Sequence, residues 1–292
     1  MNHLTSSIII TSFNESKTIG RAVDSFLNQT LIPTQIIVSA PDDETLSVAD
    51  LHGAEIIRDP GKGKSYALNL LLKDKNIKSD ILILSDGDCY VNDKAVESIV
   101  KMFEANSKVG CVSGRVIPTN DPTTSYGYFA HTLALGAHLE RQRRWKSKLP
   151  LECTGYLFAF RRKLINQFPT DVAEDAIIPL IINSKKYKTA YVPEAIGYVQ
   201  YPITFDDFVK QKIRTVKSHA KLIDYFPDVD KMKSFYKEIF RGVPILAKKT
   251  CREIGWTIRL MFIRFMIWWK ARKDIKKKIE YSDGWDRVES TK

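Results

Sequence analysis

Short apolar runs alternate with amphipathic stretches from residue 7 to about residue 192 of this 292-residue chain. The runs SIIITSF, TQIIVSA and DILILSD are largely apolar at consecutive positions, as expected for strands covered on both faces. Between them, the stretch ESKTIGRAVDSFLNQ puts its apolar residues on one side of a helix. Strands alternating with helices predict an α/β sandwich built on a mostly parallel sheet.

The positive charge of the chain is concentrated near its C-terminus. The net charge is +11, and residues 231–278 contain 15 Lys and Arg against 3 Asp and Glu, so the rest is close to neutral. A protein that binds nucleic acid more often spreads its positive charge over a binding face or a repeated motif. We therefore expect no nucleic-acid partner. We expect a globular domain over residues 1–226 and a basic, amphipathic helical segment over residues 227–292.

The basic segment contains two amphipathic stretches. In the first, Phe235, Ile239, Val243 and Leu246 recur at helical spacing. The second, IGWTIRLMFIRFMIWWKARKDIKKK, is nearly all apolar before its terminal lysine cluster, but Arg259 and Arg264 interrupt it. Because a membrane span needs about 20 apolar residues and a central arginine is costly, this stretch is expected to lie in the membrane interface.

Three tryptophans in the second stretch, Trp256, Trp268 and Trp269, suit the headgroup level, and its lysines suit an anionic leaflet. A buried helical cap on the globular domain and a transmembrane helix are the alternatives. The N-terminal apolar run lacks the basic region and cleavage site of a signal peptide. We therefore expect a cytoplasmic protein, peripheral on the inner face of the cell membrane.

The stretch RDPGKGKS, beginning at Arg58, has some features of a nucleoside-triphosphate loop. A P-loop requires a glycine five residues before its Gly-Lys pair, and Arg58 occupies that position. Asp59 and Pro60 also stand where a phosphate cradle needs free backbone N–H groups. A dinucleotide fold is excluded as well, because no G-x-G-x-x-G follows the first predicted strand.

Two acids, Asp86 and Asp88, end the buried run ILILSDGD. In extended backbone, residues two apart point to the same side, so these carboxylates would face one ligand site at the carboxyl edge of the sheet. Carboxylate oxygens suit Mg²⁺ or Mn²⁺, with diphosphate oxygens completing the coordination. A D-x-D sequence alone is often only a polar turn.

A long helix-like stretch, YGYFAHTLALGAHLERQRRWK, interrupts the sheet pattern and could be an insertion that meets a substrate. His131 and His138 are seven residues apart and share a face of this helix. Metal binding and simple helix packing both explain the pair.

The order of the motifs is more specific than any one of them. TSFNE, GKGKSYALN, DGD, TGYLFAFRR, AED and QKIR follow one another over roughly residues 5–225. This series resembles the family 2 glycosyltransferases of the GT-A fold, and the tail resembles the interfacial helices of membrane-associated members. The resemblance implies a GT-A-type nucleotide-binding sandwich and an inverting, metal-dependent hexosyltransferase.

For the donor, the resemblance implies that Asn14 and Glu15 contact the nucleoside and that Lys62 and Lys64 offset the diphosphate charge. Asp86 would face the ribose and the metal, and Asp88 would ligate Mg²⁺ or Mn²⁺ directly. In QKIR, Gln211 and Arg214 would reach the diphosphate from one helix face; a solvated helix face is the alternative for Arg214.

For the acceptor, AED resembles the family's acid pair, in which Asp175 serves as general base and Glu174 orients a substrate or an arginine. Helix N-terminal acids that favour the macrodipole are the alternative for this pair. Gly155 would let the backbone pack close to the acceptor. Thr215 replaces the tryptophan of processive synthases, and Ser39 replaces an aspartate that reads the nucleobase in many members.

The expected reaction moves a sugar from a UDP or GDP sugar to a lipid-linked or glycan acceptor at an anionic membrane surface. Two other functions stay open. One is a sugar-phosphate nucleotidylyltransferase, which would carry a glycine-rich, arginine-containing loop where this chain has TSFNE. The other is a catalytically silent membrane-surface scaffold with the same fold.

Overall fold

A computed structural model describes residues 4–228, 232, 250–276 and 291 of the chain. The first amphipathic stretch of the basic segment, with Phe235, Ile239, Val243 and Leu246, lies outside these described residues. The strands are β1 (Ser6–Thr11), β2 (Gln35–Ala40), β3 (Glu55–Arg58), β4 (Ile81–Asp86), β5 (Cys89–Val91), β6 (Val109–Pro118), β7 (Leu157–Arg161) and β8 (Lys188–Val199).

The helices are α1 (Ile19–Leu27), α2 (Asp43–Leu51), α3 (Lys64–Leu72), α4 (Ala95–Ala105), α5 (Ser125–Lys146), α6 (Glu174–Ser184), α7 (Phe205–Tyr225) and α9 (Cys251–Lys276), with a 3₁₀ turn at Arg162–Leu164. Helices α1, α4 and α7 follow the apolar periodicity of the sequence most clearly. The insertion-like stretch forms α5, a single helix capped by Thr124, whose side chain accepts a hydrogen bond from the backbone N–H of Gly127.

The strands form one mixed sheet in the order β3-β2-β1-β4-β7-β6-β8-β5. The first four strands are parallel to one another, as are β6 and β8. The expectation of a mostly parallel sheet is therefore confirmed, with two antiparallel strands: β5 runs antiparallel to β8, and β7 runs antiparallel to both β4 and β6. The reversed direction of β7 places its start at the edge of the sheet where β4 ends.

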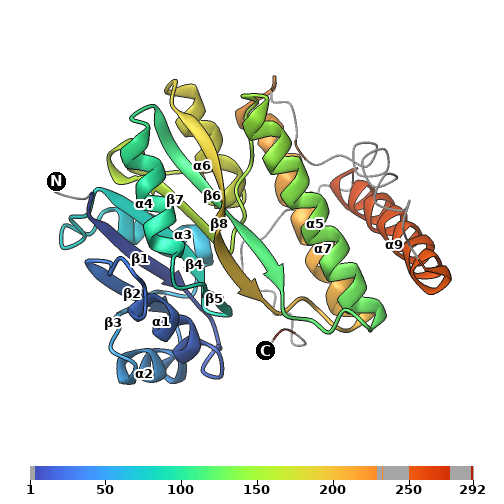
Figure 1. Ribbon diagram of the computed structural model, residues 1–292, viewed down its shortest axis with the longest axis horizontal. Coiled ribbons are helices and arrows are strands. Elements are labelled where there is room, and N and C mark those ends of the chain that lie inside the picture. Colours follow the sequence, from blue (N-terminus) through green and yellow to red (C-terminus); the bar gives the residue numbers. More distant parts are fainter. Residues whose placement is uncertain (1–3, 229–231, 233–249, 277–290, 292) are drawn as a thin grey trace.

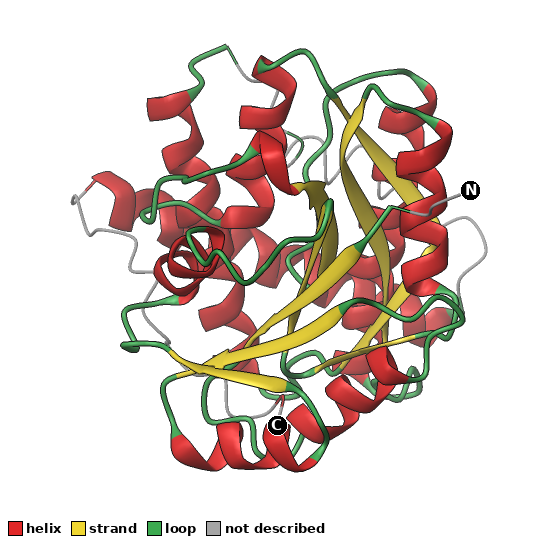
Figure 2. Cartoon of the chain, turned by 90° about the vertical axis from the view of Figure 1, so that its left-hand side faces the viewer, coloured by secondary structure: helices red, strands yellow, loops and turns green. Residues whose placement is uncertain are grey.

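Helices cover both faces of the sheet (Figure 2), which explains the continuous apolar runs. In β1, Ile8 and Ile10 share a core cluster with residues of α1, α2 and α4, whereas Ile9 belongs to a second cluster that includes residues of α3 and α6. Because every position of β1 is buried, the strand does not alternate between apolar and solvent-exposed polar residues.

The carboxyl ends of the parallel strands are in register. Thr11 of β1 pairs with Ser39 of β2 on one side and with Asp86 of β4 on the other. The connections after β1 and β4 leave the sheet at the same edge, and β1 separates β2 from β4. In open α/β sheets this is the crevice where ligands bind.

Figure 1 shows α5 next to the sheet with α7 behind it, and α9 packs against both helices. Ile263 and Ile267 of α9 are buried in one cluster with Phe129 of α5 and Phe208 of α7. Polar contacts fix the same helix: the hydroxyls of Tyr128 and Thr257 lie 2.7 Å apart, and the Lys217 ammonium lies 3.0 Å from the Asp274 carboxylate.

Within the described residues, the structure contains no helix with the length and apolar character needed to cross a membrane. Of the alternatives for the second amphipathic stretch, the packing on α5 and α7 supports a helical cap for one face of α9.

The two histidines of α5 have separate partners. His131 Nε2 donates to the carbonyl of Asn120 at 2.9 Å, and His138 Nδ1 lies 2.7 Å from the hydroxyl of Tyr191. Helix packing therefore accounts for the pair.

Candidate active site

The side chain of Lys64 joins three segments of the chain at the carboxyl edge. Its Nζ lies 2.5 Å from Oδ1 of Asp86, 2.6 Å from Oε1 of Glu174 and 3.3 Å from the carbonyl oxygen of Gly155. Asp86 ends β4, Gly155 precedes β7, and Glu174 begins α6. Residues separated by up to 110 positions in sequence thus meet at one ammonium group, which we call the Lys64 cluster.

The cluster is largely shielded from water, since the side chains of Lys64 and Glu174 are only 14% and 6% exposed. Burial by itself lowers the pKa of Lys64, but the neighbouring charges of Asp86 and Glu174 outweigh it, and the pKa is raised. Lys64 therefore stays protonated, and its charge balances carboxylates that would otherwise repel one another.

The glycine-lysine loop turns Lys64 inward. Gly61 and Gly63 have φ values of 68° and 105°, which side-chain-bearing residues rarely adopt, and α3 begins directly after them. The N–H of Gly61 donates to the Asp59 carboxylate at 2.8 Å, so an acid occupies a donor that a phosphate-binding P-loop would need. Lys62 is exposed and lies over the ring of Tyr66, outside the Lys64 cluster.

The D-x-D segment has a geometry different from the one expected. β4 ends at Asp86, and Gly87 and Asp88 form a turn into β5, so the alternation of an extended strand does not align the two acids. Both carboxylates are nevertheless partly exposed at the same edge, and both influence Tyr156. Burial raises the pKa of Tyr156, and the charges of Asp88 and Asp86 raise it further.

The donor chemistry of this turn fits a hard divalent cation that shares its ligands with a substrate. Among the described residues, no group of three or more His, Cys, Asp or Glu side chains is arranged to hold a metal ion. Asp86 and Asp88 would contribute carboxylate oxygens only, which suit Mg²⁺ or Mn²⁺ when phosphate oxygens complete the coordination.

The loop after β1 packs against the D-x-D turn. Glu15 is buried, and its Oε2 accepts a hydrogen bond of 2.6 Å from the Ser12 hydroxyl. Asn14 is exposed with a φ of 51°, and its N–H donates to the carboxylate of Asp42 at 2.8 Å. Glu15 therefore lies beside the turn that carries Asp86 and Asp88, whereas Asn14 is held at Asp42.

Gly87 is required where the two loops touch. A Cβ at this position would lie 2.2 Å from Ser12 Oγ and 2.3 Å from Glu15 Oε2. We expect Gly87→Ala to lower the free energy of unfolding by about 1–3 kcal/mol, the usual cost of overpacking, as measured by urea denaturation. Gly136→Ala is the control, because no atom lies within 4 Å of its added Cβ. Equal stability of the two variants would contradict this contact.

Gly155 leaves space in front of the two acids that begin α6. A Cβ on Gly155 would lie 3.6 Å from Asp175 Oδ2 and 3.7 Å from Glu174 Oε1. The backbone carbonyl of Asp175 accepts a hydrogen bond of 3.0 Å from the N–H of Cys153, which ties the start of α6 to the segment before Gly155. Asp175 is partly exposed, whereas Glu174 is buried in the Lys64 cluster.

Gln211 and Arg214 lie one turn apart on α7, as predicted. Gln211 Nε2 donates to the hydroxyl of Tyr156 at 3.3 Å, and its Oε1 is buried without a hydrogen-bond partner among the described residues. Arg214 is exposed, and its charge counteracts the rise in the pKa of Tyr156. Tyr156 thus connects the α7 pair to the D-x-D turn, a role that sequence reasoning missed.

Several buried polar residues that support the site were also missed. Ser218 Oγ accepts a hydrogen bond of 2.7 Å from the N–H of Ala173, just before α6, and His219 Nε2 lies 3.0 Å from Oε2 of Glu152. Arg141 donates to the carbonyl oxygens of Glu152 and Cys153. No local pattern reveals these pairs, because their members are 11 to 67 positions apart in the chain.

Ser39, which replaces an aspartate of many family members, is paired with an acid from the next strand. Its hydroxyl donates to the carboxylate of Asp59 at 3.0 Å, and both side chains are buried. A carboxylate is therefore present beside β2, supplied by the residue after β3.

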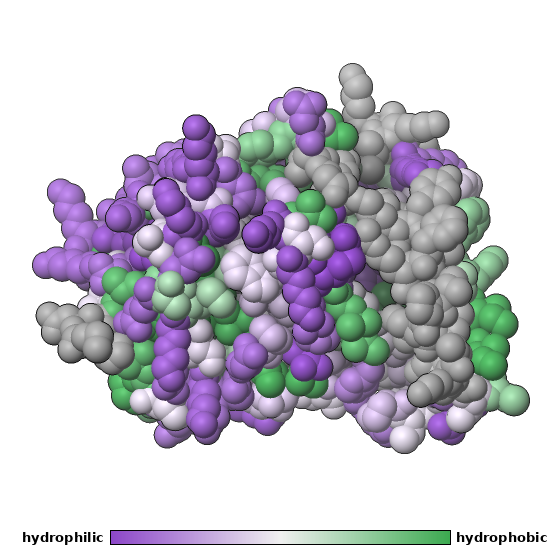
Figure 3. Space-filling model, turned by 45° about the horizontal axis from the view of Figure 1, so that its top comes forward, coloured by the Kyte–Doolittle hydropathy of each residue, from purple (hydrophilic) through white to green (hydrophobic). Residues whose placement is uncertain are grey.

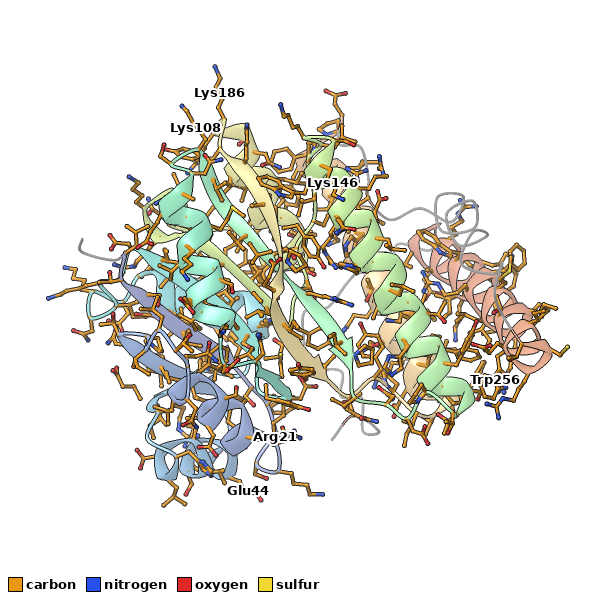
Figure 4. The ribbon with its side chains drawn as sticks, in the orientation of Figure 1. Arg21, Glu44, Lys108, Lys146, Lys186 and Trp256 are labelled. Atoms are coloured by element: carbon orange, nitrogen blue, oxygen red, sulfur yellow. The ribbon has the colours of Figure 1, made fainter. Side chains whose placement is uncertain are left out.

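The three tryptophans assigned to the membrane interface occupy different environments. Trp256 lies against Tyr128, with ring centroids 5.6 Å apart, and Trp268 is likewise partly buried in the cluster with α5 and α7. Trp269 is 60% exposed. Figure 4 labels Trp256 at the end of α9 that adjoins α5.

Known structures share this architecture. A mannosyltransferase from Pyrobaculum calidifontis, in complex with GDP-mannose and Mn²⁺, has a TM-score of 0.61 at 17% identity, covering 94% of this chain and 81% of its own. A glucosyl-3-phosphoglycerate synthase from Mycobacterium tuberculosis, in complex with Mn²⁺ and UDP, has a TM-score of 0.53 at 18% identity, covering 78% of this chain and 82% of its own. These similarities confirm the GT-A-type fold.

Sequence comparison finds two bacterial relatives. The probable glycosyltransferase YdaM of Bacillus subtilis is 24% identical over 74% of this chain and 48% of its own length. The poly-β-1,6-N-acetyl-D-glucosamine synthase of Staphylococcus epidermidis is 23% identical over 89% of this chain and 65% of its own length. The chain therefore spans about half to two thirds of the length of these relatives.

The family model of glycosyl transferase family 2 matches residues 7–168, more than half of the chain. The chain belongs to glycosyl transferase family 2.

Proposed function

We propose that this protein transfers a sugar from a nucleoside diphosphate sugar, of the UDP or GDP type, to a hydroxyl of an acceptor and inverts the anomeric configuration. The proposal rests on one observation above all: the Lys64 ammonium joins Asp86 on the donor side to Glu174, which begins the helix that carries Asp175. Family membership supports the reaction class and favours it over a nucleotidylyltransferase.

On the donor side, Asn14 and Glu15 would contact the nucleoside, and Lys64 would lie near the diphosphate. Asp86 and Asp88 would hold Mg²⁺ or Mn²⁺, which would neutralise the charge on the departing diphosphate. Arg214 and Gln211 would approach the same region from α7. The proteins of similar structure that contain Mn²⁺ together with GDP-mannose or UDP support this assignment.

On the acceptor side, Asp175 would act as general base. Its carboxylate would take the proton of the acceptor hydroxyl as that oxygen attacks the anomeric carbon, and the bond between this carbon and the diphosphate oxygen would break. A single displacement of this kind inverts the configuration. The space over Gly155 would admit the acceptor, and Glu174 would position Asp175 through the Lys64 cluster.

The acceptor we propose is a lipid-linked sugar or a growing glycan at the cytoplasmic face of the membrane. A glycan-polymerising relative supports this class, as does the basic character of the C-terminal segment. Because Thr215 stands where processive synthases have tryptophan, we propose that the protein adds a limited number of sugars.

Asp88→Asn tests the donor site directly. We expect the variant to lose the gain in UDP or GDP affinity that Mn²⁺ gives, because an amide is a weaker ligand for a hard cation than a carboxylate. Isothermal titration with and without Mn²⁺ measures this gain. Asp93→Asn serves as a control outside the turn. Unchanged metal dependence in Asp88→Asn would remove this residue from the site, and a wild-type protein without any metal-dependent nucleotide binding would favour the silent scaffold.

A further inference from the structure

Helix α9 has a second apolar face, on the side that is not packed against α5 and α7. Its members share large, exposed side chains at helical spacing: Ile254, Ile258, Met261, Phe262, Phe265 and Trp269. At about 100° per residue they fall within roughly 100° of arc, so they form one stripe, which we call the α9 outer face. Ile258 is 64% and Phe262 is 70% exposed.

The opposite side of α9 is packed against α5 and α7. Leu260, Ile263, Ile267 and Ala271 are buried on α5 and α7, and Lys217 pairs with Asp274. A helix that served only as a cap would present polar residues to solvent on its other face. Figure 3 shows hydrophobic side chains along the right-hand edge of the molecule, where Figure 1 has α9.

Positively charged side chains are exposed on the same helix as the outer face. Arg259, Lys270, Arg272 and Lys273 are exposed on α9. The acids of the described part of α9 are engaged within the protein: Glu253 accepts hydrogen bonds from Thr250, and Asp274 pairs with Lys217. An exposed apolar stripe bordered by cations is complementary to a bilayer surface that contains anionic lipid.

We propose that the α9 outer face docks in the plane of a membrane containing anionic lipid, with its apolar side chains among the headgroups and upper acyl chains. A second copy of the chain fits less well, because a symmetric contact between outer faces would bring like charges together. This surface goes beyond the transfer reaction proposed above, and its test needs neither donor nor acceptor. It also revises the residue set expected from the sequence, since Trp269 alone of the three tryptophans belongs to the outer face.

The test compares two matched double variants in sedimentation with vesicles of phosphatidylcholine alone or mixed with equimolar phosphatidylglycerol. We expect the full-length protein to sediment with the anionic vesicles, and Ile258→Asp/Phe262→Asp to lower the partition coefficient at least about tenfold. Ile32→Asp/Leu51→Asp is the control, because these residues are 64% and 82% exposed on another part of the surface and the charge change is identical. Thermal melts compare the folding of both variants.

An independent readout follows tryptophan fluorescence in the wild-type protein and in one single variant. Brominated lipid in the same vesicles is expected to quench tryptophan fluorescence, and Trp269→Ala is expected to remove most of that quenching. Wild-type protein that stays in the supernatant, equal binding by Ile258→Asp/Phe262→Asp, or quenching unaffected by Trp269→Ala would overturn the proposal. A wild-type dimer that the outer-face variant dissociates, without vesicle binding, would assign the face to a second copy instead.

Discussion

Asp175→Asn is expected to lower the rate of sugar transfer by about 10²–10⁴-fold while leaving nucleotide binding unchanged, because an amide cannot take the proton of the acceptor hydroxyl. Asp175 is partly exposed beside Gly155, and its backbone is fixed by Cys153, so the substitution should leave the fold intact. Single-turnover transfer from the nucleotide sugar to a water-soluble acceptor measures the rate. Titration of UDP or GDP in Mn²⁺ measures donor binding.

The matched control for this experiment is Asp171→Asn. Asp171 lies four positions earlier, and its carboxylate interacts with Tyr225 and Lys221 rather than with the site. We expect this control to transfer sugar at the wild-type rate. An Asp175→Asn variant with undiminished transfer would exclude Asp175 as the base, and loss of donor binding in that variant would assign Asp175 to the donor site instead.

Lys64→Met is expected to cost about 3–5 kcal/mol in the free energy of unfolding, because it leaves buried carboxylate charge without its cation. The Glu174 side chain is 6% exposed and lies 2.6 Å from Lys64 Nζ, so water cannot replace the ammonium fully. Denaturation in urea, followed by circular dichroism, measures the change. The same variant should also bind UDP or GDP more weakly, since a positive charge near the diphosphate is lost.

Two further variants separate charge from shape in the Lys64 cluster. Lys62→Met changes an exposed lysine two residues away and should alter stability by no more than about 0.5 kcal/mol. Lys64→Met/Glu174→Gln removes the buried charge together with its partner, and we expect it to recover much of the lost stability. A Lys64→Met variant as stable as wild type would show that the carboxylates of the Lys64 cluster do not need the ammonium group for stability.

Periodicity and motif order predicted most of the framework. Ile8, Ile9 and Ile10 are consecutive apolar residues because both faces of β1 are covered, and this property is readable along the chain. Gln211 and Arg214 were correctly expected to share a helix face, because their spacing is local. The family resemblance, drawn from the sequence of motifs, is confirmed over residues 7–168.

Prediction failed where the backbone changes direction or where distant residues meet. The strand that carries Asp86 ends there, so the rule of alternating sides did not extend to Asp88. The pairing of Lys64 with Glu174 and the hydrogen bond between Gln211 and Tyr156 join segments far apart in sequence. The partial burial of Trp256 and Trp268 depends on which face of α9 meets α5 and α7, and the period of one helix cannot determine its partner.

The amino-acid sequence alone determined the class of fold, the family and the residues available for chemistry, because apolar period and motif order are properties of neighbouring positions. Only the tertiary structure decided that Lys64 links Asp86 to Glu174, that Asp59 accompanies Ser39, and that one face of α9 is packed while the other stays exposed. These outcomes depend on strand order, on the reversal of β7 and on how helices pack, and such long-range contacts leave no periodic trace along the chain.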